Sequence, residues 1–415
     1  MHQLLERAQR RAGRLLREWL PLNLHYRPVG IHATSRELPE IPGAAATYYE
    51  VEAAHTSHTD IPAAFYEAAS AYGGHLHSKP PRTEEVPAAF VLELRGGRLY
   101  ADNNDSVAVI AADDRLVGDA SFQYTNKTWE TIRPEDNNIF RQAYFLEPVP
   151  VAGTVCSLLA GGGAAIGNYY HWLIDSLPRL HLLQAAGLLR EVDYFLVYNR
   201  DWRFVLQTLT PLGIRPEQVI DVRTHRHLRA DRLLVTSPVR GTGAHTPEWA
   251  CDFLRRSYLP PDPALVQARQ FAPYVYISRR DADARHVLNE AAVEELLRPY
   301  GFRTYVLSQL SFAEKVALFG GAKAIIGPVG AGLSNLAFAA PGTPVLELLP
   351  QGFVVPDFME FSYRLGLSYQ WLVCPNAQAA TNLGDARREH LTVDLDALRL
   401  CLTHLLGQPA AAVAS

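Results

Sequence analysis

Two side chains four residues apart, His171 and Asp175, have the types and spacing that acid–base chemistry needs. Residues four apart share one face of a helix, so the Asp175 carboxylate would orient the His171 imidazole as a general base. The alternative is a histidine without a catalytic role, packed against Trp172. Polar and aromatic neighbours favour the functional interpretation and are predicted to support the pair or contact an acceptor: Asn168, Tyr170 and Arg179.

A second group of residues is suited to binding an anion. Ser278, Arg279 and Arg280 follow an apolar run typical of a buried strand, and Arg285 lies shortly beyond them. In open α/β sheets, ligands bind outside the carboxyl ends of the strands. A guanidinium group donates two parallel hydrogen bonds to a phosphate. The sequence therefore predicts a diphosphate site, and the alternative is a set of solvated surface arginines.

A glycine loop forms the other half of the predicted anion site. The run Gly330-Ala331-Gly332 follows an apolar strand pattern and precedes a short helix that contains Asn335. At the start of a helix, free backbone N–H groups and the positive end of the helix dipole favour a phosphate. The alternative is that both glycines serve only a tight turn and close helix–sheet packing.

The elements that must position these residues alternate between helices and strands. This alternation predicts parallel sheets covered on both faces, and hence an α/β protein with two doubly wound domains. The predicted helices cover residues 169–186, 202–212, 247–258, 286–298, 312–319 and 391–406, and the predicted strands cover 194–198, 219–222, 233–236, 274–278, 303–307, 324–328 and 344–348.

A polar connection, Pro260-Pro261-Asp262-Pro263, separates the two predicted domains. Before them, turn residues between short alternating runs predict a meander of strands at 90–94, 106–110 and 142–146. The predicted division of the chain is an N-terminal helix and irregular segment (1–83), a β-rich segment (84–150), a first Rossmann-like acceptor domain (151–262), a second Rossmann-like nucleotide-sugar domain (263–375), and a closing helix with a tail (376–415).

Composition limits the classes of function. The chain of 415 residues is 48% hydrophobic and 20% charged, which is typical of a globular protein with more than one domain. A net charge of −4 argues against nucleic-acid binding. Four cysteines without a Cys-x-x-Cys motif indicate neither a zinc site nor a disulfide framework, and they favour a reducing, cytoplasmic location. The uncharged run at 148–174 is too polar and too rich in glycine to span a membrane.

The beginning of the chain has a different character. Residues 2–20 place leucines, alanines and a tryptophan at helical spacing, with arginines between them, which predicts a basic amphipathic helix. Three surroundings suit such a helix: the anionic inner face of a membrane, the rest of the protein, or a second subunit of a homo-oligomer.

Three motifs in this order resemble those of family-61 glycosyltransferases. They are Asn-Tyr-Tyr-His-Trp at 168–172 with Asp175, Tyr-Ile-Ser-Arg at 276–279, and Gly-Pro-Val-Gly-Ala-Gly-Leu-Ser-Asn at 327–335 followed by Glu347. The resemblance implies a GT-B arrangement of two facing Rossmann-like domains, with inverting transfer from a nucleotide sugar and no required metal or other cofactor. Bacterial members are labelled as capsular polysaccharide biosynthesis proteins. The resemblance thus also implies a UDP-linked donor and a glycan or lipid-linked acceptor in surface polysaccharide synthesis.

The resemblance also suggests roles for individual residues. It implies that the donor diphosphate binds near Ser278, Arg279 and the loop at 330–332, and that Glu347 accepts hydrogen bonds from the donor ribose. His171 and Asp175 would lie across the cleft, toward the acceptor. One departure from the family is Val329, where many relatives have His or another polar residue.

Three other interpretations have to be weighed. The pairs Asp281/Asp283 and Asp394/Asp396 have the spacing of a metal-binding acidic motif, but arginines beside the first pair would compete with a cation. The glycine run at 161–167 resembles the loop of an NAD-dependent oxidoreductase, yet it lacks the Gly-x-Gly-x-x-Gly register and the acidic residue that should follow. A non-catalytic protein that binds a nucleotide or a sugar fits the same two-domain pattern.

Overall fold

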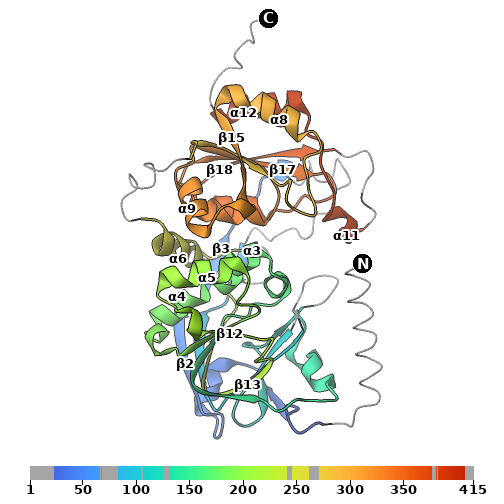
Figure 1. Ribbon diagram of the computed structural model, residues 1–415. Coiled ribbons are helices and arrows are strands. Elements are labelled where there is room, and N and C mark those ends of the chain that lie inside the picture. Colours follow the sequence, from blue (N-terminus) through green and yellow to red (C-terminus); the bar gives the residue numbers. More distant parts are fainter. Residues whose placement is uncertain are drawn as a thin grey trace, which may run out of the picture.

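The computed structural model describes residues 23–65, 67, 83–103, 106–124, 131–240, 245–260, 271–375, 380 and 382–406. Figure 1 shows two bodies stacked one above the other, each with its own sheet and helices. We call residues 23–260 the N-lobe and residues 271–406 the C-lobe. The predicted α/β class is confirmed. The predicted N-terminal helix at 2–20 lies outside the described residues.

The N-lobe is built on a mixed sheet. Four strands, in the order β13-β10-β11-β12, run parallel, while β5 and β6 pair antiparallel with β13. The β-rich segment and the parallel strands therefore share one sheet. Its described strands are β1 Gly30–His32, β2 Ala46–Glu52, β5 Ala89–Arg95, β6 Arg98–Asn103, β7 Ser106–Ile110, β8 Arg115–Val117, β9 Phe122–Gln123, β10 Val149–Ser157, β11 Tyr194–Val197, β12 Val219–Asp221 and β13 His227–Thr236.

The strand predicted at 142–146 is wrong. Only an isolated bridge, between Tyr144 and Asn23, forms there. Phe145 is fully buried and packs against Tyr100 and His227. The segment is thus anchored by one large ring instead of by the regular alternation of a strand.

The continuous helix predicted at 169–186 is also wrong, because it breaks into three pieces. These are α3 Tyr169–His171, a π-helical turn Trp172–Ser176 and α4 Arg179–Ala185. The Leu177 amide donates to the Trp172 carbonyl, five residues back, at 2.9 Å. Pro178 follows, and because it has no N–H group it cannot continue the hydrogen-bond pattern. Turns of π-helix are frequent at functional sites.

Two further helices cover the junction side of the N-lobe, α5 Arg203–Leu209 and α6 Glu248–Tyr258. Both match predicted helices, at 202–212 and 247–258. Arg255 of α6 donates to the carbonyl oxygens of Ala337 at 3.0 Å and of Ala339 at 2.7 Å. This helix therefore joins the N-lobe to the C-lobe.

The C-lobe contains a five-stranded, fully parallel sheet in the order β15-β14-β16-β17-β18. Its apolar strands are largely buried, as expected when helices cover both faces. The strands are β14 Tyr274–Ser278, β15 Phe302–Val306, β16 Ala324–Pro328, β17 Pro344–Pro350 and β18 Ser368–Cys374, and the helices are α8 Glu290–Leu297, α9 Phe312–Gly320, α10 Asp357–Arg364, α11 Leu383–Ala386 and α12 Leu395–Leu406.

Three predicted helices of the C-lobe differ in detail. Val287 forms a parallel bridge with Leu391, so α8 and α12 begin several residues later than predicted. The short helix predicted after the glycine loop is present and is a 3-10 helix, Ala331–Phe338. A 3-10 helix is tighter and is usually short.

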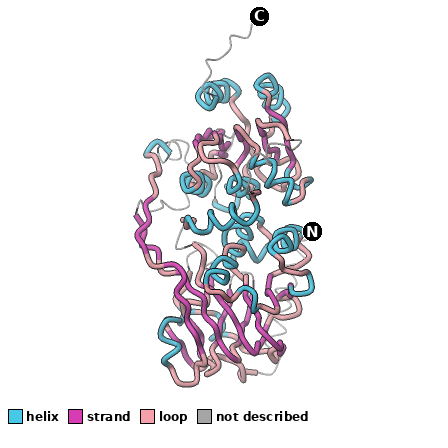
Figure 2. Tube along the Cα trace, turned by 90° about the vertical axis from the view of Figure 1, so that its left-hand side faces the viewer, coloured by secondary structure: helices cyan, strands magenta, loops and turns pink. Residues whose placement is uncertain are grey.

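A segment from the beginning of the chain crosses between the lobes. Strand β3 His55–His58 pairs with β4 Thr83–Val86, and Phe65 packs edge to face on Trp371 of the C-lobe. Figure 2 shows this strand path climbing from the lower body toward the upper one. One buried apolar cluster accordingly contains residues of both lobes. No helix in the described ranges is both long and apolar enough to span a membrane.

Candidate functional site

The location of His171 depends on the glycine run that follows β10. Asn168 begins α3, and its Oδ1 accepts a hydrogen bond from the Tyr170 amide at 3.0 Å. The imidazole then packs directly on the backbone of Gly163: a Cβ added there would lie 1.9 Å from Cδ2 of His171. Glycine is therefore required at 163, so the run that resembled a dinucleotide loop makes room for His171 instead.

His171 and Asp175 form the predicted pair. His171 Nδ1 lies 2.7 Å from Asp175 Oδ2. Arg240, which follows β13, donates from Nε to Oδ1 at 2.6 Å and from Nη2 to Oδ2 at 3.0 Å. The Asp175 carboxylate is thus held by two groups. We call His171, Asp175 and Arg240 the first triad.

The charges in the first triad settle the state of its carboxylate. Burial by itself would raise the pKa of Asp175, but the charge of Arg240 and the hydrogen bond from His171 outweigh it and hold this pKa well below its usual value. An ionised carboxylate only accepts, so Nδ1 of His171 carries the proton. Nε2 has no hydrogen bond to any described residue, and the side chain is 29% exposed. The arrangement leaves Nε2 able to accept a proton from a hydroxyl group.

On the C-lobe, Arg279 lies against the glycine loop. A Cβ on Gly330 would lie 2.0 Å from Arg279 Nη1, so only glycine allows this approach. The guanidinium group also donates to the Ala284 carbonyl from Nε at 3.3 Å and from Nη2 at 3.2 Å. The two halves of the predicted anion site are therefore in direct contact.

Arg285 lies near Arg279 and has a strained backbone conformation. Its φ of 60° is in the left-handed region, and its guanidinium carbon is 5.3 Å from the ring centroid of Phe353. Its Nε is buried without a hydrogen-bond partner. Burial, with the charge of Arg279 added, lowers the pKa of Arg285 to about 10. Strained residues and unsatisfied buried donors are concentrated at functional sites.

The three predicted arginines differ in whether their charge is neutralised. Arg280 forms ion pairs with Glu290 at 3.2 Å and with Glu294. Neither Arg279 nor Arg285 has an ion pair within the described parts of the chain. Two partly buried cations without a carboxylate partner make a site suited to an anion.

Glu347 is fully buried at the middle of β17. Tyr369 donates to its Oε2, while Oε1 is buried without a partner. Burial raises the pKa of Glu347 to about 8. The group therefore keeps its proton near neutral pH and has one oxygen free for a further hydrogen bond.

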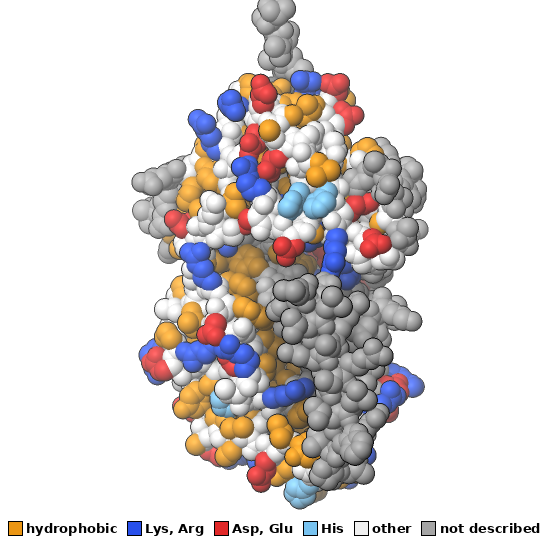
Figure 3. Space-filling view, turned by 45° about the vertical axis from the view of Figure 1, so that its right-hand side comes forward, with side chains coloured by type: hydrophobic (Ala, Val, Ile, Leu, Met, Phe, Trp, Pro, Cys, Tyr) orange, Lys and Arg blue, Asp and Glu red, His pale blue; other side chains and the backbone are white. Residues whose placement is uncertain are grey.

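The fold brings these two constellations to the junction of the lobes. Tyr169 Oη donates to Asn335 Oδ1 at 2.8 Å, which joins α3 to the 3-10 helix after the glycine loop. The charge of Asp357, the first residue of α10, acts on Arg240 in the first triad and on Glu347 of the C-lobe. Figure 3 shows Lys or Arg side chains at this waist, beside a recessed hydrophobic band.

Several predicted site residues have structural partners. Ser278 is buried, and its Oγ accepts from Arg280 Nε at 2.9 Å. Arg179 is buried and donates to the backbone oxygen of Asp175 at 3.1 Å and to Thr236 Oγ1 at 3.1 Å. The remaining predicted residues also lie at the junction. Tyr170 Oη accepts a hydrogen bond from Arg240 Nη1 at 3.0 Å. Asn335, which follows Ala331 and Gly332 in the same 3-10 helix, donates to the Gly332 carbonyl at 2.8 Å and accepts from Tyr169.

Sequence reasoning missed Arg240 and Asp357. Arg240 lies just past the carboxyl end of β13, so the rule that identified Arg279 could have found it. Asp357 begins α10 directly after Pro356, and no motif marks it. Tyr369 and Arg387 also act on the C-lobe site, through Glu347 and Arg285.

Other regions do not gather such groups. No three metal-ligating side chains converge within the ranges that the structure describes, and Asp281 and Asp283 are exposed. A surface hollow of about 420 Å³ lies near Arg223, but that guanidinium is already paired with Asp201 and Asp221. The junction of the lobes is therefore the candidate active site.

Comparison with known proteins adds one finding. Residues 169–346 match the family model described as Glycosyltransferase 61. The match begins at Tyr169, two residues before His171, and ends one residue before Glu347. It therefore includes the His171–Asp175 pair, both unpaired arginines, Arg279 and Arg285, and the glycine loop. No curated protein matches the chain.

Proposed function

Because residues 169–346 match the family model described as Glycosyltransferase 61, and glycosyl transfer is the activity of that family, we propose that this protein is an inverting, metal-independent glycosyltransferase. Its donor is a nucleotide sugar, most simply a UDP-linked one, and its acceptor is a hydroxyl group of a glycan or of a lipid-linked glycan. The process it serves is surface polysaccharide synthesis.

One observation carries the proposal. Arg279 and Arg285, two cations without an ion pair in the described chain, lie with the glycine loop at the junction that also contains His171. A leaving diphosphate needs positive charge, and an attacking hydroxyl group needs a base. The arginines of the C-lobe and His171 of the N-lobe support the proposal, because a GT-B enzyme would draw these two kinds of group from its two lobes.

The proposed reaction uses these groups in one displacement. The acceptor oxygen attacks the anomeric carbon from the face opposite the diphosphate, and its proton passes to Nε2 of His171. The bond from that carbon to the diphosphate oxygen breaks, and its electron pair leaves on the diphosphate. Arg279 and Arg285 neutralise the charge that develops there. Asp175 stabilises the imidazolium that His171 becomes.

Calorimetry with UDP and GDP tests the diphosphate site. Arg279→Ala should lose about 1.5 to 3 kcal/mol of nucleotide affinity, as expected for a charged hydrogen-bonding partner. The matched control is Arg280→Ala, because Arg280 is already paired with Glu290 and Glu294. An Arg279→Ala variant with unchanged affinity for both nucleotides would remove the diphosphate site from the proposal.

A turnover assay separates an enzyme from a protein that only binds. Hydrolysis or transfer should be detected with one of the common UDP-, GDP- or CMP-sugars and should survive EDTA. Nucleotide binding without any turnover would instead support the non-catalytic alternative. Activity that is lost with EDTA and restored by Mn²⁺ would overturn the metal-independent step and return attention to Asp281 and Asp283.

The proposed location is the cytoplasmic side of the membrane where lipid-linked glycans are built. The four cysteines, Cys156, Cys251, Cys374 and Cys401, are all free, which suits a reducing compartment. The basic segment at 2–20 would provide peripheral contact with anionic lipid. Sedimentation with anionic vesicles, before and after removal of residues 2–20, tests that contact.

A further inference from the structure

Every nitrogen of the Arg240 guanidinium group has a hydrogen-bond partner, on Asp175 or on Tyr170. Nε and Nη2 bind the two carboxylate oxygens of Asp175, and Nη1 donates to Tyr170 Oη at 3.0 Å. The guanidinium carbon also lies 5.2 Å from the ring centroid of Tyr170. Such a two-point contact fixes the plane of the carboxylate as well as its charge.

Asp175 Oδ2 is shared between two donors. It accepts from Arg240 Nη2 at 3.0 Å and from His171 Nδ1 at 2.7 Å. Without Arg240, the full negative charge of a buried carboxylate would face the imidazole alone and would favour the imidazolium. With Arg240, the arginine and the carboxylate together are close to neutral, so the negative charge that faces the imidazole is balanced.

Among the residues that the structure describes, no other cation binds the Asp175 carboxylate. Arg179 binds the backbone oxygen of Asp175 and Thr236, not the carboxylate. Tyr124 is neutral, because burial and the Asp175 charge raise its pKa. The charges that face Arg240 from α10 are carboxylates, those of Asp357 and Glu360.

We propose that Arg240 is a positioning residue that keeps His171 in the proton-accepting form, by balancing Asp175 and fixing the plane of its carboxylate. The role of His171 as the base rests on the function proposed above. The effect of Arg240 on the imidazole does not depend on that function, so the effect of Arg240 and the role of His171 as the base can be tested separately.

The test is the pH titration of the His171 side chain by ¹⁵N NMR, with its signals assigned by their loss in His171→Ala. Arg240→Gln removes the charge but keeps a hydrogen-bonding side chain of similar reach. In this variant the titration midpoint of His171 should move to higher pH by about one unit or more. Arg240→Lys restores the charge without the two-point contact, so its midpoint should return toward that of the wild type.

Arg255→Met is the matched control, because Arg255 is a partly buried arginine whose bonds go to backbone carbonyls of the C-lobe. It should lower the melting temperature without moving the His171 midpoint. An unchanged midpoint in Arg240→Gln, or an equal shift in Arg255→Met, would overturn the proposal. If Arg240→Gln does not fold, Arg240→Met takes its place: it also removes the charge and should raise the His171 midpoint, and an unchanged midpoint in Arg240→Met would overturn the proposal.

This titration needs neither donor nor acceptor. Once a turnover assay is available, the acid limb of the kcat/KM profile should move in Arg240→Gln by the same amount as the NMR midpoint. A shifted NMR midpoint in a protein without any transferase activity would support the role of Arg240 and count against the proposed function. A shifted acid limb without an NMR shift would count against Arg240 alone.

Discussion

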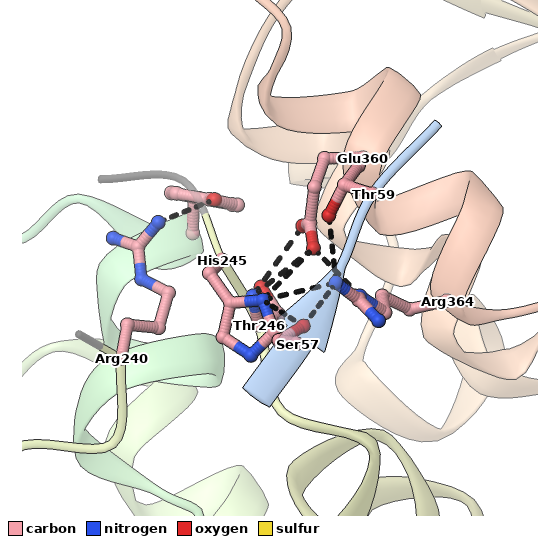
Figure 4. Close-up of polar contacts among 8 residues, drawn as sticks. Ser57, Thr59, Arg240, His245, Thr246, Glu360 and Arg364 are labelled. Atoms are coloured by element: carbon pink, nitrogen blue, oxygen red, sulfur yellow. Dashed lines mark hydrogen bonds and ion pairs between the residues drawn. The ribbon is translucent and has the colours of Figure 1, made fainter. Parts of the chain in front are cut away.

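The protein buries two clusters that each combine a carboxylate, an arginine and a histidine, and they behave differently. The first triad is His171, Asp175 and Arg240. The second triad is His245, Glu360 and Arg364, where α10 meets the N-lobe. Figure 4 shows Arg240 and Arg364 on opposite sides of His245, so the two clusters are close neighbours.

In the second triad, the carboxylate is poorly supplied with donors. Arg364 Nε donates to Glu360 Oε1 at 2.9 Å, and the Thr246 amide lies 3.4 Å from each oxygen. Burial therefore raises the pKa of Glu360 to about 7, although Arg364 opposes the shift. Burial, with the charge of Arg364 added, lowers the pKa of His245 to about 4. Between about pH 4 and pH 7, the Glu360 carboxyl group and the His245 imidazole are therefore both uncharged, and both are closed to solvent.

The same residue types thus occupy two different environments. In the first triad, Arg240 donates two hydrogen bonds to Asp175 and keeps its carboxylate charged, while one edge of the His171 ring is exposed to solvent. In the second triad, His245 is only 5% exposed. Arg364 donates hydrogen bonds to Ser57 and Thr59, which belong to the segment around β3 that crosses between the lobes. The number of donors on the carboxylate and the access of solvent to the histidine make the difference.

The largest expected effect separates the two histidines. His171→Ala should lower kcat by about 10²-fold or more, the usual scale when a general base is lost, with nucleotide affinity nearly unchanged. His245→Ala is the matched control and should keep kcat within a few-fold of the wild type while lowering stability. Steady-state kinetics and calorimetry measure both. Near wild-type turnover in His171→Ala, together with an inactive Asp175→Asn, would reverse the roles assigned to those two residues.

The second prediction concerns pH and Glu360. Because its pKa is raised from 4.5 to about 7 on folding, the stability linked to its proton is present below about pH 4.5 and is lost as the pH rises through about 7. Glutamine is neutral at every pH. Relative to the wild type, the free energy of unfolding of Glu360→Gln should therefore improve by about 3 kcal/mol between pH 4.5 and pH 8.

Urea unfolding at a series of pH values measures this difference. Glu295→Gln, at an exposed position of α8, is the control, and its difference from the wild type should stay constant. A constant difference for Glu360→Gln as well would mean that the second triad holds an ionised carboxylate, like the first.

The smallest predicted effect tests the second triad as a structural contact. Ser57 Oγ accepts from Arg364 Nη2 at 2.7 Å across the junction. Ser57→Ala should lower the free energy of unfolding by about 1 kcal/mol, with turnover unchanged. Thr56→Ala is the matched control. The Thr56 hydroxyl donates to Glu85 on the exposed side of the β3–β4 pair, so its loss should lower the free energy of unfolding by less. A loss of turnover in Ser57→Ala would show that the crossing segment also acts on catalysis.

Local patterns explain what the sequence predicted well. Strand β14 was predicted with the bounds it has, Tyr274–Ser278, because an apolar run ends there in polar residues. His171 and Asp175 were paired because a separation of four residues brings them together in any helical turn. These features depend on neighbours within one element, so the residue order is sufficient to find them.

Contacts between residues far apart in the chain explain what the sequence did not predict. Arg240 binds Asp175 across 65 residues, and Glu360 meets Thr246 across 114. The sequence also could not tell Arg279 from Arg280, which are adjacent. One lies against Gly330 without an ion pair, and the other turns to Glu290 and Glu294.

The amino-acid sequence by itself determined the α/β class, the strand ends that carry the polar motifs, and the His171–Asp175 pair. Only the tertiary structure decided which arginines are neutralised, which histidine reaches solvent, and which carboxylate stays charged. The physical reason is that charge interactions and desolvation depend on distance and burial in space. Two identical sets of residue types, Asp or Glu with Arg and His, therefore have opposite protonation behaviour within one junction.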